Sequence, residues 1–201
     1  MSIRIYVEGG GDSNQLRRQC RAGFKEFFEK AGLKGRMPRV VACGSRQRAY
    51  DQFCAAINEA ETDSFIVLLV DSEAAVASGD SPWDHLRKRD NWTQPSAAVD
   101  DSAQLMVQCM EAWFVADRQS LGVYFGKDFN AAALPARDDV EAIAKDDLER
   151  TLKQATRPCS KGKGTYRKGR HSFDLLGCLE PNKVMEASPH ARRLIDALRR
   201  S

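Results

Sequence analysis

The sequence lacks long apolar runs. Along its 201 residues no stretch reaches the roughly 18 apolar residues that a membrane-spanning helix needs. The first residues, MSIRIYVEGG, hold only a short apolar run that ends at a glutamate, which is unlike the core of a secretory signal. We therefore expect a cytoplasmic protein without a membrane segment.

Closely spaced cysteines are also missing. The six cysteines stand at positions 20, 43, 54, 109, 159 and 178. No two of them have the short separation typical of paired zinc ligands. We expect buried, reduced thiols and no zinc site.

Familiar nucleotide-binding motifs are absent as well. The segment Gly162-Lys163-Gly164-Thr165 is not a P-loop, because a glycine separates the lysine from the threonine. The glycines that follow Glu8 do not complete a dinucleotide fingerprint, since Asn14 stands where the third glycine is needed. With three histidines and no nucleophile motif, nothing in the sequence supports a serine or cysteine nucleophile.

The net charge is small, but the basic residues are unevenly distributed. The formal charge of +3 gives no reason by itself to expect nucleic acid. Residues 34–48 hold five basic side chains and no acid, and residues 157–170 hold six and no acid. We expect these segments to contact nucleic-acid phosphates, through Arg46, Arg48, Lys161, Lys163, Arg167 and Arg170. The alternative is a pair of solvated basic loops.

Hydrophobic patterning predicts strands alternating with helices. Residues 3–7 alternate, and residues 65–70 (FIVLLV) are apolar throughout, as in a strand covered on both faces. The expected strands are 3–7, 39–43, 65–70 and 105–109. The expected helices are 13–31 (capped by Asp12 or Ser13), 46–57 (capped by Ser45), 83–88, 111–121, 138–155 and 191–200.

This element order predicts an α/β fold, with a parallel sheet of about four strands flanked by helices. We expect an α/β core at residues 1–125, interrupted by an insertion or lid at 72–104. Residues 126–201 are expected to form a helical and basic C-terminal extension packed on the core.

Two acidic motifs follow strands of this predicted sheet. They are VEGGGD at residues 7–12 and LVDSEA at residues 69–74. Glu8 and Asp71 therefore stand at the carboxyl ends of strands, and Glu73, two residues on, would point to the same side as Asp71 in extended chain. Three crowded carboxylates repel one another, and Mg²⁺ or Mn²⁺ would relieve that repulsion. The alternative is a set of solvated loop acids and helix caps.

These residues resemble the Toprim pattern of topoisomerases, primases and overcoming-lysogenization-defect nucleases. That pattern has a glutamate after the first strand and Asp-x-Asp after the third. The matches here are Glu8 and Asp71-Ser72-Glu73, so a glutamate replaces the second aspartate. The resemblance covers roughly residues 1–110 and implies a metal-dependent nuclease with a Toprim-like sheet.

The whole chain is similar to a bacterial family assigned to the Toprim-like group. The similarity extends through CMEAWFVAD at residues 109–117 and YRKGRHSFDLL at residues 166–176. Some members are thought to lie beside ATPases in genome-defence loci. The resemblance therefore implies an ATPase encoded nearby as a partner.

Three further residues are candidates for the same site. Glu111 follows the fourth predicted strand and is either a further metal ligand or an acid that stabilises the first turn of its helix. Lys168 would offset charge on a scissile phosphate, a role like that of the lysine in some Toprim nucleases. His171 would donate a proton or hold phosphate. The alternatives are a solvated basic loop for Lys168 and a helix-cap contact beside Ser172 for His171.

Two functions are compatible with this pattern. In the first, the protein is a metal-dependent nuclease: Asp71 and Glu73 anchor one or two Mg²⁺ or Mn²⁺ ions, and Glu8 ligates the second ion or acts as general base. In the second, it is a non-catalytic docking or regulatory subunit of an ATPase complex. A homo-oligomer is compatible with either.

Overall fold

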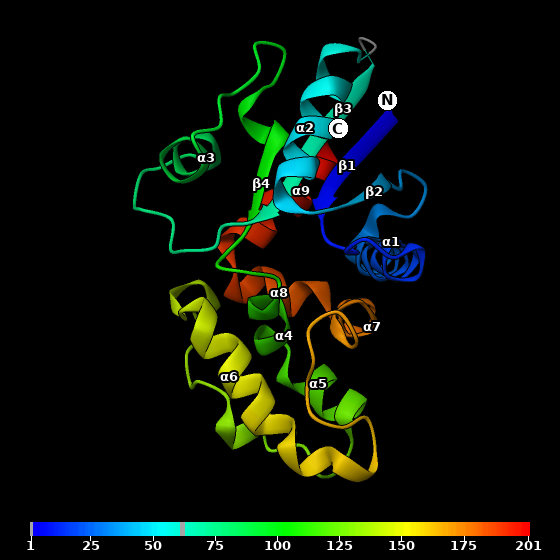
Figure 1. The fold of residues 1–201 in the computed structure, drawn as a ribbon, viewed down its shortest axis with the longest axis vertical. Coiled ribbons are helices and arrows are strands. Elements are labelled where there is room, and N and C mark those ends of the chain that lie inside the picture. Colours follow the sequence, from blue (N-terminus) through cyan, green and yellow to red (C-terminus); the bar gives the residue numbers. More distant parts are fainter. Residues whose placement is uncertain (1, 61–62) are drawn as a thin grey trace.

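The described residues form a sheet of four parallel strands in the order β2, β1, β3, β4 (Figure 1). The computed structural model describes residues 2–60 and 63–201. The strands are β1 (Ser2–Glu8), β2 (Arg39–Gly44), β3 (Ser64–Asp71) and β4 (Ala103–Met106). Because β1 and β3 are parallel neighbours, their carboxyl ends meet at the same edge. The predicted α/β fold is confirmed.

Helices cover both faces of this sheet. The helices are α1 (Asn14–Phe28), α2 (Arg46–Asn58), α3 (Pro82–Asp90), α7 (Ser172–Cys178) and α9 (Pro189–Arg200). Ile5 and Val7 pack in one apolar core with α1, α7 and α9, while Tyr6 packs in a second core with α2 and α3. This alternation along β1 is the side-chain pattern of a strand covered on both faces.

Serine caps begin the first two long helices, as the sequence predicts. The Ser13 hydroxyl accepts a hydrogen bond from the backbone N–H of Leu16 at 3.1 Å. The Ser45 hydroxyl accepts one from the N–H of Arg48 at 3.4 Å. Each cap satisfies a backbone donor that the first turn leaves free. Both helices therefore start close to the carboxyl ends of β1 and β2.

A mainly helical region lies beyond the carboxyl ends of the strands (Figure 1). It contains α4 (Glu111–Ala116), α5 (Arg118–Phe125), α6 (Lys145–Thr156) and α8 (Pro181–Ala187). From there α9 returns to the sheet, and Arg193 donates to the carbonyl of Ala103 in β4 at 2.8 Å. Short turns complete the chain: a π-helix at Glu29–Leu33 and 3₁₀ helices at Asp100–Ser102, Ala131–Ala133, Val140–Ala142 and Arg157–Lys161.

The predicted helix at 111–121 is two helices that meet at Asp117. The carboxylate of Asp117 caps α5, because it accepts from the N–H of Ser120 at 3.2 Å. It also accepts from the N–H of Glu180 at 2.9 Å and lies 3.2 Å from Lys183 Nζ. Asp117 thus ties α5 to α8, a contact that helical periodicity along one segment does not reveal.

Two other predicted elements have different boundaries. The predicted helix at 138–155 begins only at Lys145, and Val140 is buried through a 3₁₀ turn instead. The predicted strand at 105–109 is β4, which ends at Met106. In both cases apolar residues continue past the true boundary, since the neighbouring helical layer buries them without requiring a regular element.

All six cysteines are free thiols. Cys20, Cys43, Cys109 and Cys159 are buried and Cys54 is half-buried, whereas Cys178 is exposed. The prediction of buried thiols is therefore wrong for Cys178. Among the helices of residues 2–60 and 63–201, none has both the length and the apolar character that crossing a membrane requires.

Candidate metal centre

An irregularity at the end of β1 directs Glu8 towards β3. The register with β2 shifts between Val7 and Glu8, so that Glu8 lies opposite Gly44. Gly9 and Gly44 then exchange backbone hydrogen bonds of 3.0 and 2.8 Å. Gly44 has φ of +85°, and a Cβ there would lie 2.7 Å from the carbonyl oxygen of Gly11, so only glycine fits. The turn leaves Glu8 Oε2 3.3 Å from the N–H of Asp71, from which it accepts a hydrogen bond.

Asp71 ends β3 and is 6% exposed. Its Oδ1 accepts a hydrogen bond of 2.9 Å from the backbone N–H of Met110. Its Oδ2 lies 3.8 Å from the ammonium nitrogen of Lys168. One oxygen of the carboxylate is thus fixed by the backbone, and the other lies near the Lys168 ammonium.

Glu73 reaches the same place by a route the sequence does not predict. Since β3 ends at Asp71, the two residues are not consecutive positions on one side of a strand. Glu73 instead has φ of 68°, a left-handed conformation that is uncommon outside glycine, and its N–H donates to the carbonyl of Gln108 at 2.8 Å. Its carboxylate accepts a hydrogen bond from Lys145 and lies 3.7 Å from Arg89.

The three predicted carboxylates converge. Glu8, Asp71 and Glu73 each offer one oxygen, and these oxygens lie within 4.8 Å of one another. Glu8 and Asp71 also line a cavity of about 290 Å³, together with Gly10, Lys168 and Phe173. Oxygen donors of this kind suit Mg²⁺ or Mn²⁺.

The electrostatics of the metal-free site also fit a cation. Burial and then the Glu8 charge raise the pKa of Asp71 to about 8, although Lys168 opposes the rise. Burial likewise raises the pKa of Glu8, against the effect of Arg46. Two neighbouring carboxyl groups therefore resist ionisation, and the charge of a bound cation would offset that resistance.

This electrostatic state predicts pH-dependent metal binding. Asp71 must be ionised to bind a metal ion, and it keeps its proton up to a pH of about 8. Mn²⁺ affinity should therefore rise by about tenfold per pH unit between about pH 6 and 8, then level off. Calorimetry in buffers of different ionisation enthalpy would measure both the affinity and the released proton. An affinity that is constant over this range would contradict the prediction.

Arg46 lies inside the site. It is an ion-pair partner of Glu8 at 3.3 Å and of Asp90 at 2.7 Å, and it donates to the carbonyl of Asp71. Its guanidinium also lies over the Trp92 ring, 5.0 Å from the ring centroid. These contacts support a positioning role for Arg46, which orients Glu8. A direct contact between Arg46 and nucleic acid stays a prediction.

Glu111 does not join the three converging carboxylates. It is 2% exposed at the start of α4, and its Oε1 accepts a hydrogen bond of 2.8 Å from the Tyr166 hydroxyl. Its Oε2 lies 3.5 Å from Lys168 Nζ. Lys168 therefore lies between Asp71 and Glu111. Burial alone would lower the pKa of Lys168, but Glu111 and Asp71 outweigh it and raise the pKa.

Removing the Tyr166 hydroxyl should destabilise the protein. Tyr166→Phe leaves the buried Glu111 carboxylate without its hydrogen-bond donor, which costs about 1–3 kcal/mol of unfolding free energy. Tyr124→Phe is the matched control, because that half-buried hydroxyl makes only a 3.5 Å contact with Asp174; its effect should stay within about 0.5 kcal/mol. Urea unfolding measures both. Equal losses of unfolding free energy in the two variants would show that the hydrogen bond to Glu111 does not stabilise the protein.

His171 lies among aromatic rings and not at the cavity. It is 3% exposed, its Nδ1 accepts from the N–H of Arg167 at 3.0 Å, and its ring is 5.7 Å from that of Phe125. Burial lowers the pKa of His171. These contacts order the basic loop at residues 157–170, which precedes α7. The catalytic role predicted for His171 stays a prediction, and none of its contacts supports that role.

The remaining predicted phosphate contacts lie on the surface. Arg48 forms an ion pair of 2.8 Å with Asp12, which follows the glycine turn at Gly9 to Gly11. The others are exposed along the loop that precedes α7, namely Lys161, Lys163, Arg167 and Arg170. Their contact with nucleic acid stays a prediction.

Sequence reasoning missed the groups that hold the carboxylates in place. Lys145 and Arg89 neutralise Glu73, and Asp90 pairs with Arg46. Lys145 is 72 residues from Glu73 in the chain, and Lys145 belongs to no recognisable motif. No local signal in the sequence could have paired them.

Comparison with known families places this site in context. A family described as a domain of unknown function, DUF4276, matches residues 7–199. The chain belongs to the DUF4276 family. The matched region includes Glu8, Asp71, Glu73 and Lys168. Comparison with curated proteins gave no match, and comparison with solved structures gave none either.

Proposed function

We propose that the protein is a metal-dependent nuclease, a phosphodiesterase in which Glu8, Asp71 and Glu73 hold Mg²⁺ or Mn²⁺. The observation that carries the proposal is the convergence of these three carboxylates at the joint carboxyl end of β1 and β3. Acids after the first and third strands of a parallel sheet also resemble the Toprim pattern, which adds support. Ligand sites of open α/β sheets commonly lie at this edge.

Asp71 is the central ligand of the proposed site. It is the most buried of the three carboxylates, and Met110 fixes one of its oxygens. Glu73 would exchange its contact with Lys145 for the cation, so we expect a smaller contribution to metal affinity from Glu73 than from Asp71. When bound, a divalent cation supplies Lewis acidity towards a phosphate oxygen and an attacking water.

Glu8 is the proposed proton acceptor. Its Oε2 is occupied by Arg46 and by the N–H of Asp71. In the described part of the chain, Oε1 makes no hydrogen bond. Burial raises the pKa of Glu8, which makes the carboxylate a better base than a free glutamate. Glu8 Oε1 can therefore take the proton of a water that attacks phosphorus.

Lys168 and the glycine turn form the proposed phosphate side of the cavity. Lys168 lines the same cavity as the turn Gly9 to Gly11. It would stabilise the negative charge that builds on the phosphate as the bond to the leaving oxygen breaks. The turn carries no side chains that would obstruct a phosphodiester near the carboxylates.

The proposal is tested with the purified full chain. Plasmid, single-stranded DNA and tRNA are incubated with Mg²⁺, Mn²⁺ or EDTA, with and without an ATPase encoded nearby. Metal-dependent cleavage of at least one substrate is the expected result. Absence of both cleavage and Mn²⁺ binding would refute the nuclease and favour the non-catalytic docking subunit.

A further inference from the structure

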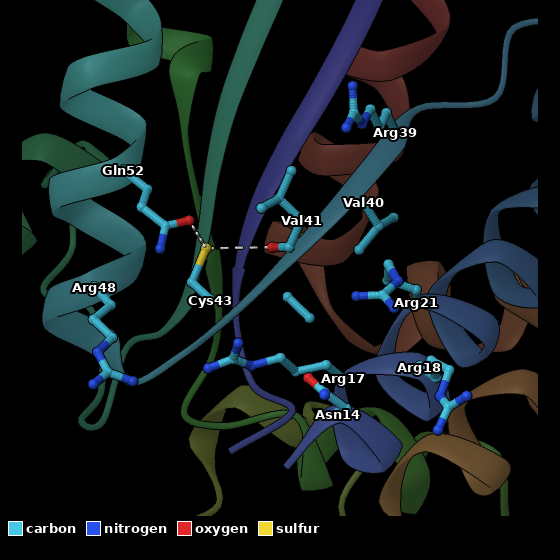
Figure 2. A pocket seen from close by; sticks show the side chains of 11 residues that line it. Asn14, Arg17, Arg18, Arg21, Arg39, Val40, Val41, Cys43, Arg48 and Gln52 are labelled. Carbon is cyan, nitrogen blue, oxygen red and sulfur yellow. Dashed lines mark hydrogen bonds between the residues drawn. The ribbon is translucent and has the colours of Figure 1, made fainter. Parts of the chain in front are cut away.

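A second, larger cavity runs along the outer side of β2. Its volume is about 940 Å³, and α1, β2 and α2 supply its walls. Figure 2 shows Arg17, Arg18 and Arg21 on α1, Arg39 on β2 and Arg48 on α2 around this space. We call these five residues and the hollow between them the arginine groove.

The arginine groove carries uncompensated positive charge. Arg18, Arg21 and Arg39 are exposed and make no ion pair or side-chain hydrogen bond within residues 2–60 and 63–201. No acidic residue belongs to the described lining, and the neighbouring Asp12 neutralises only Arg48. Arg17 and Arg21 are one helical turn apart, about 6 Å along the axis of α1. A polyanion with closely spaced charges matches this surface.

The groove leads directly to the proposed metal site. Arg17 donates to the carbonyl of Gly11 at 3.3 Å. A Cβ on Gly10 would lie 2.9 Å from the Cα of Arg17, and one on Gly44 would lie 3.8 Å from its guanidinium. Gly10, Gly11 and Gly44 also line the cavity that contains Glu8 and Asp71. The glycine turn is therefore the shared wall of the two hollows.

We propose that the arginine groove binds the phosphodiester backbone of a double-stranded nucleic acid and delivers it to the carboxylates. This inference rests on the proposed function. The charged lining consists entirely of arginine, whose planar guanidinium binds phosphate through paired hydrogen bonds. No aromatic side chain belongs to the described lining, so the groove has no platform on which the bases of a single strand could stack. Backbone contacts alone give binding that is sensitive to salt and tolerant of sequence.

The competing occupant is a protein strand added to the open edge of β2. The charge distribution favours the nucleic acid, because Arg18, Arg21 and Arg39 have no acidic partner among the described residues. Dependence of the oligomeric state on these arginines would indicate the protein strand instead.

The test measures binding separately from catalysis. Fluorescence anisotropy follows a labelled duplex and a single strand of equal length over a range of NaCl concentrations. The full chain carries Asp71→Asn and EDTA is present, so that no cleavage occurs. The groove variant combines Arg18→Gln, Arg21→Gln and Arg39→Gln, and spares Arg17 because it holds the glycine turn. The control variant combines Arg137→Gln, Arg150→Gln and Lys153→Gln, which removes the same charge from exposed positions elsewhere.

The groove variant should bind the duplex about tenfold to a hundredfold more weakly. The slope of log affinity against log salt should fall by up to about 3, since each lost phosphate contact removes about 0.9. The control variant should bind like the parent. Circular dichroism checks folding, and the pair Arg18→Gln and Arg39→Gln, with an expected slope change of about 2, replaces the triple variant if that variant unfolds.

Other outcomes overturn the inference. These are equal binding by the groove and control variants, tighter binding of the single strand than of the duplex, no duplex binding by the parent, or a dimer that dissociates in the groove variant. Metal titration of the chain with Asp71 intact distinguishes the two proposals. If the groove variant binds Mn²⁺ and cleaves while duplex binding is unchanged, only the groove proposal fails. If the chain binds no metal but the groove variant loses duplex binding, only the nuclease proposal fails.

Discussion

Asp71→Asn should abolish Mn²⁺ binding and metal-dependent cleavage while raising the melting temperature of the metal-free protein. Asparagine keeps the acceptor for the N–H of Met110 and removes the charge that Asp71 would carry above a pH of about 8, which the other carboxylates repel. Metal affinity and cleavage rate should each fall by more than about a hundredfold. Calorimetry with Mn²⁺ and a cleavage assay measure the two losses.

The stabilisation has a defined pH dependence. The folded pKa of Asp71, about 8, lies above the unfolded value, so the folded state binds the proton more tightly. Stability of the parent therefore falls as pH rises towards about 8. Asparagine removes this penalty, and the gain should be largest at and above about pH 8. Each 1 kcal/mol recovered raises the melting temperature by about 2–4 °C in a chain of this length.

Asp117→Asn is the matched control for Asp71→Asn. Both aspartates are buried. Burial alone would raise the pKa of Asp117, but hydrogen bonds from Ser120, Glu180 and Lys183 outweigh it and lower the pKa. Losing this charge should lower the melting temperature at neutral pH and leave Mn²⁺ binding unchanged. The proposed role of Asp71 as metal ligand is wrong if Asp71→Asn still cleaves at the parental rate. It is also wrong if Asp71→Asn and Asp117→Asn lose metal binding equally.

Lys168→Met should slow cleavage by about a hundredfold to a thousandfold while Mn²⁺ affinity is retained or increased. The Lys168 ammonium is 3.8 Å from Asp71 and 3.5 Å from Glu111, where it opposes the approach of a cation. Methionine removes that repulsion and keeps the unbranched side chain. The lost charge acts on the phosphate in the transition state, so the rate falls and metal binding does not.

Lys161→Met provides the comparison within the same basic loop. Lys161 is exposed and does not line the cavity that holds the carboxylates. Its removal should change substrate binding slightly and leave the cleavage rate at saturating substrate unchanged. A role for Lys168 confined to substrate binding would appear as equal rates for both variants at saturation. Loss of Mn²⁺ binding in Lys168→Met would mean that this lysine stabilises the metal site instead.

The fold was predictable where local pattern and burial agree. FIVLLV at residues 65–70 is β3 because a strand covered on both faces requires apolar side chains throughout. Ser13 and Ser45 predict the starts of α1 and α2 because a cap acts within one turn of its own position. Prediction failed at residues 107–109 and 138–144, where apolar residues are buried without belonging to a strand or an α-helix.

The sequence by itself determined that Glu8 and Asp71 lie at the carboxyl ends of two parallel strands, and the order of the sheet then made those strands neighbours. Both follow strands of a parallel sheet, and neighbouring parallel strands place their carboxyl ends at one edge. Only the tertiary structure decided which cations surround them, since Lys145, Lys168 and Arg46 come from α6, the basic loop and α2. It also assembled the arginine groove from α1, β2 and α2. Sequence patterns report contacts within a few residues, whereas these arrangements depend on how elements distant in the chain pack against one another.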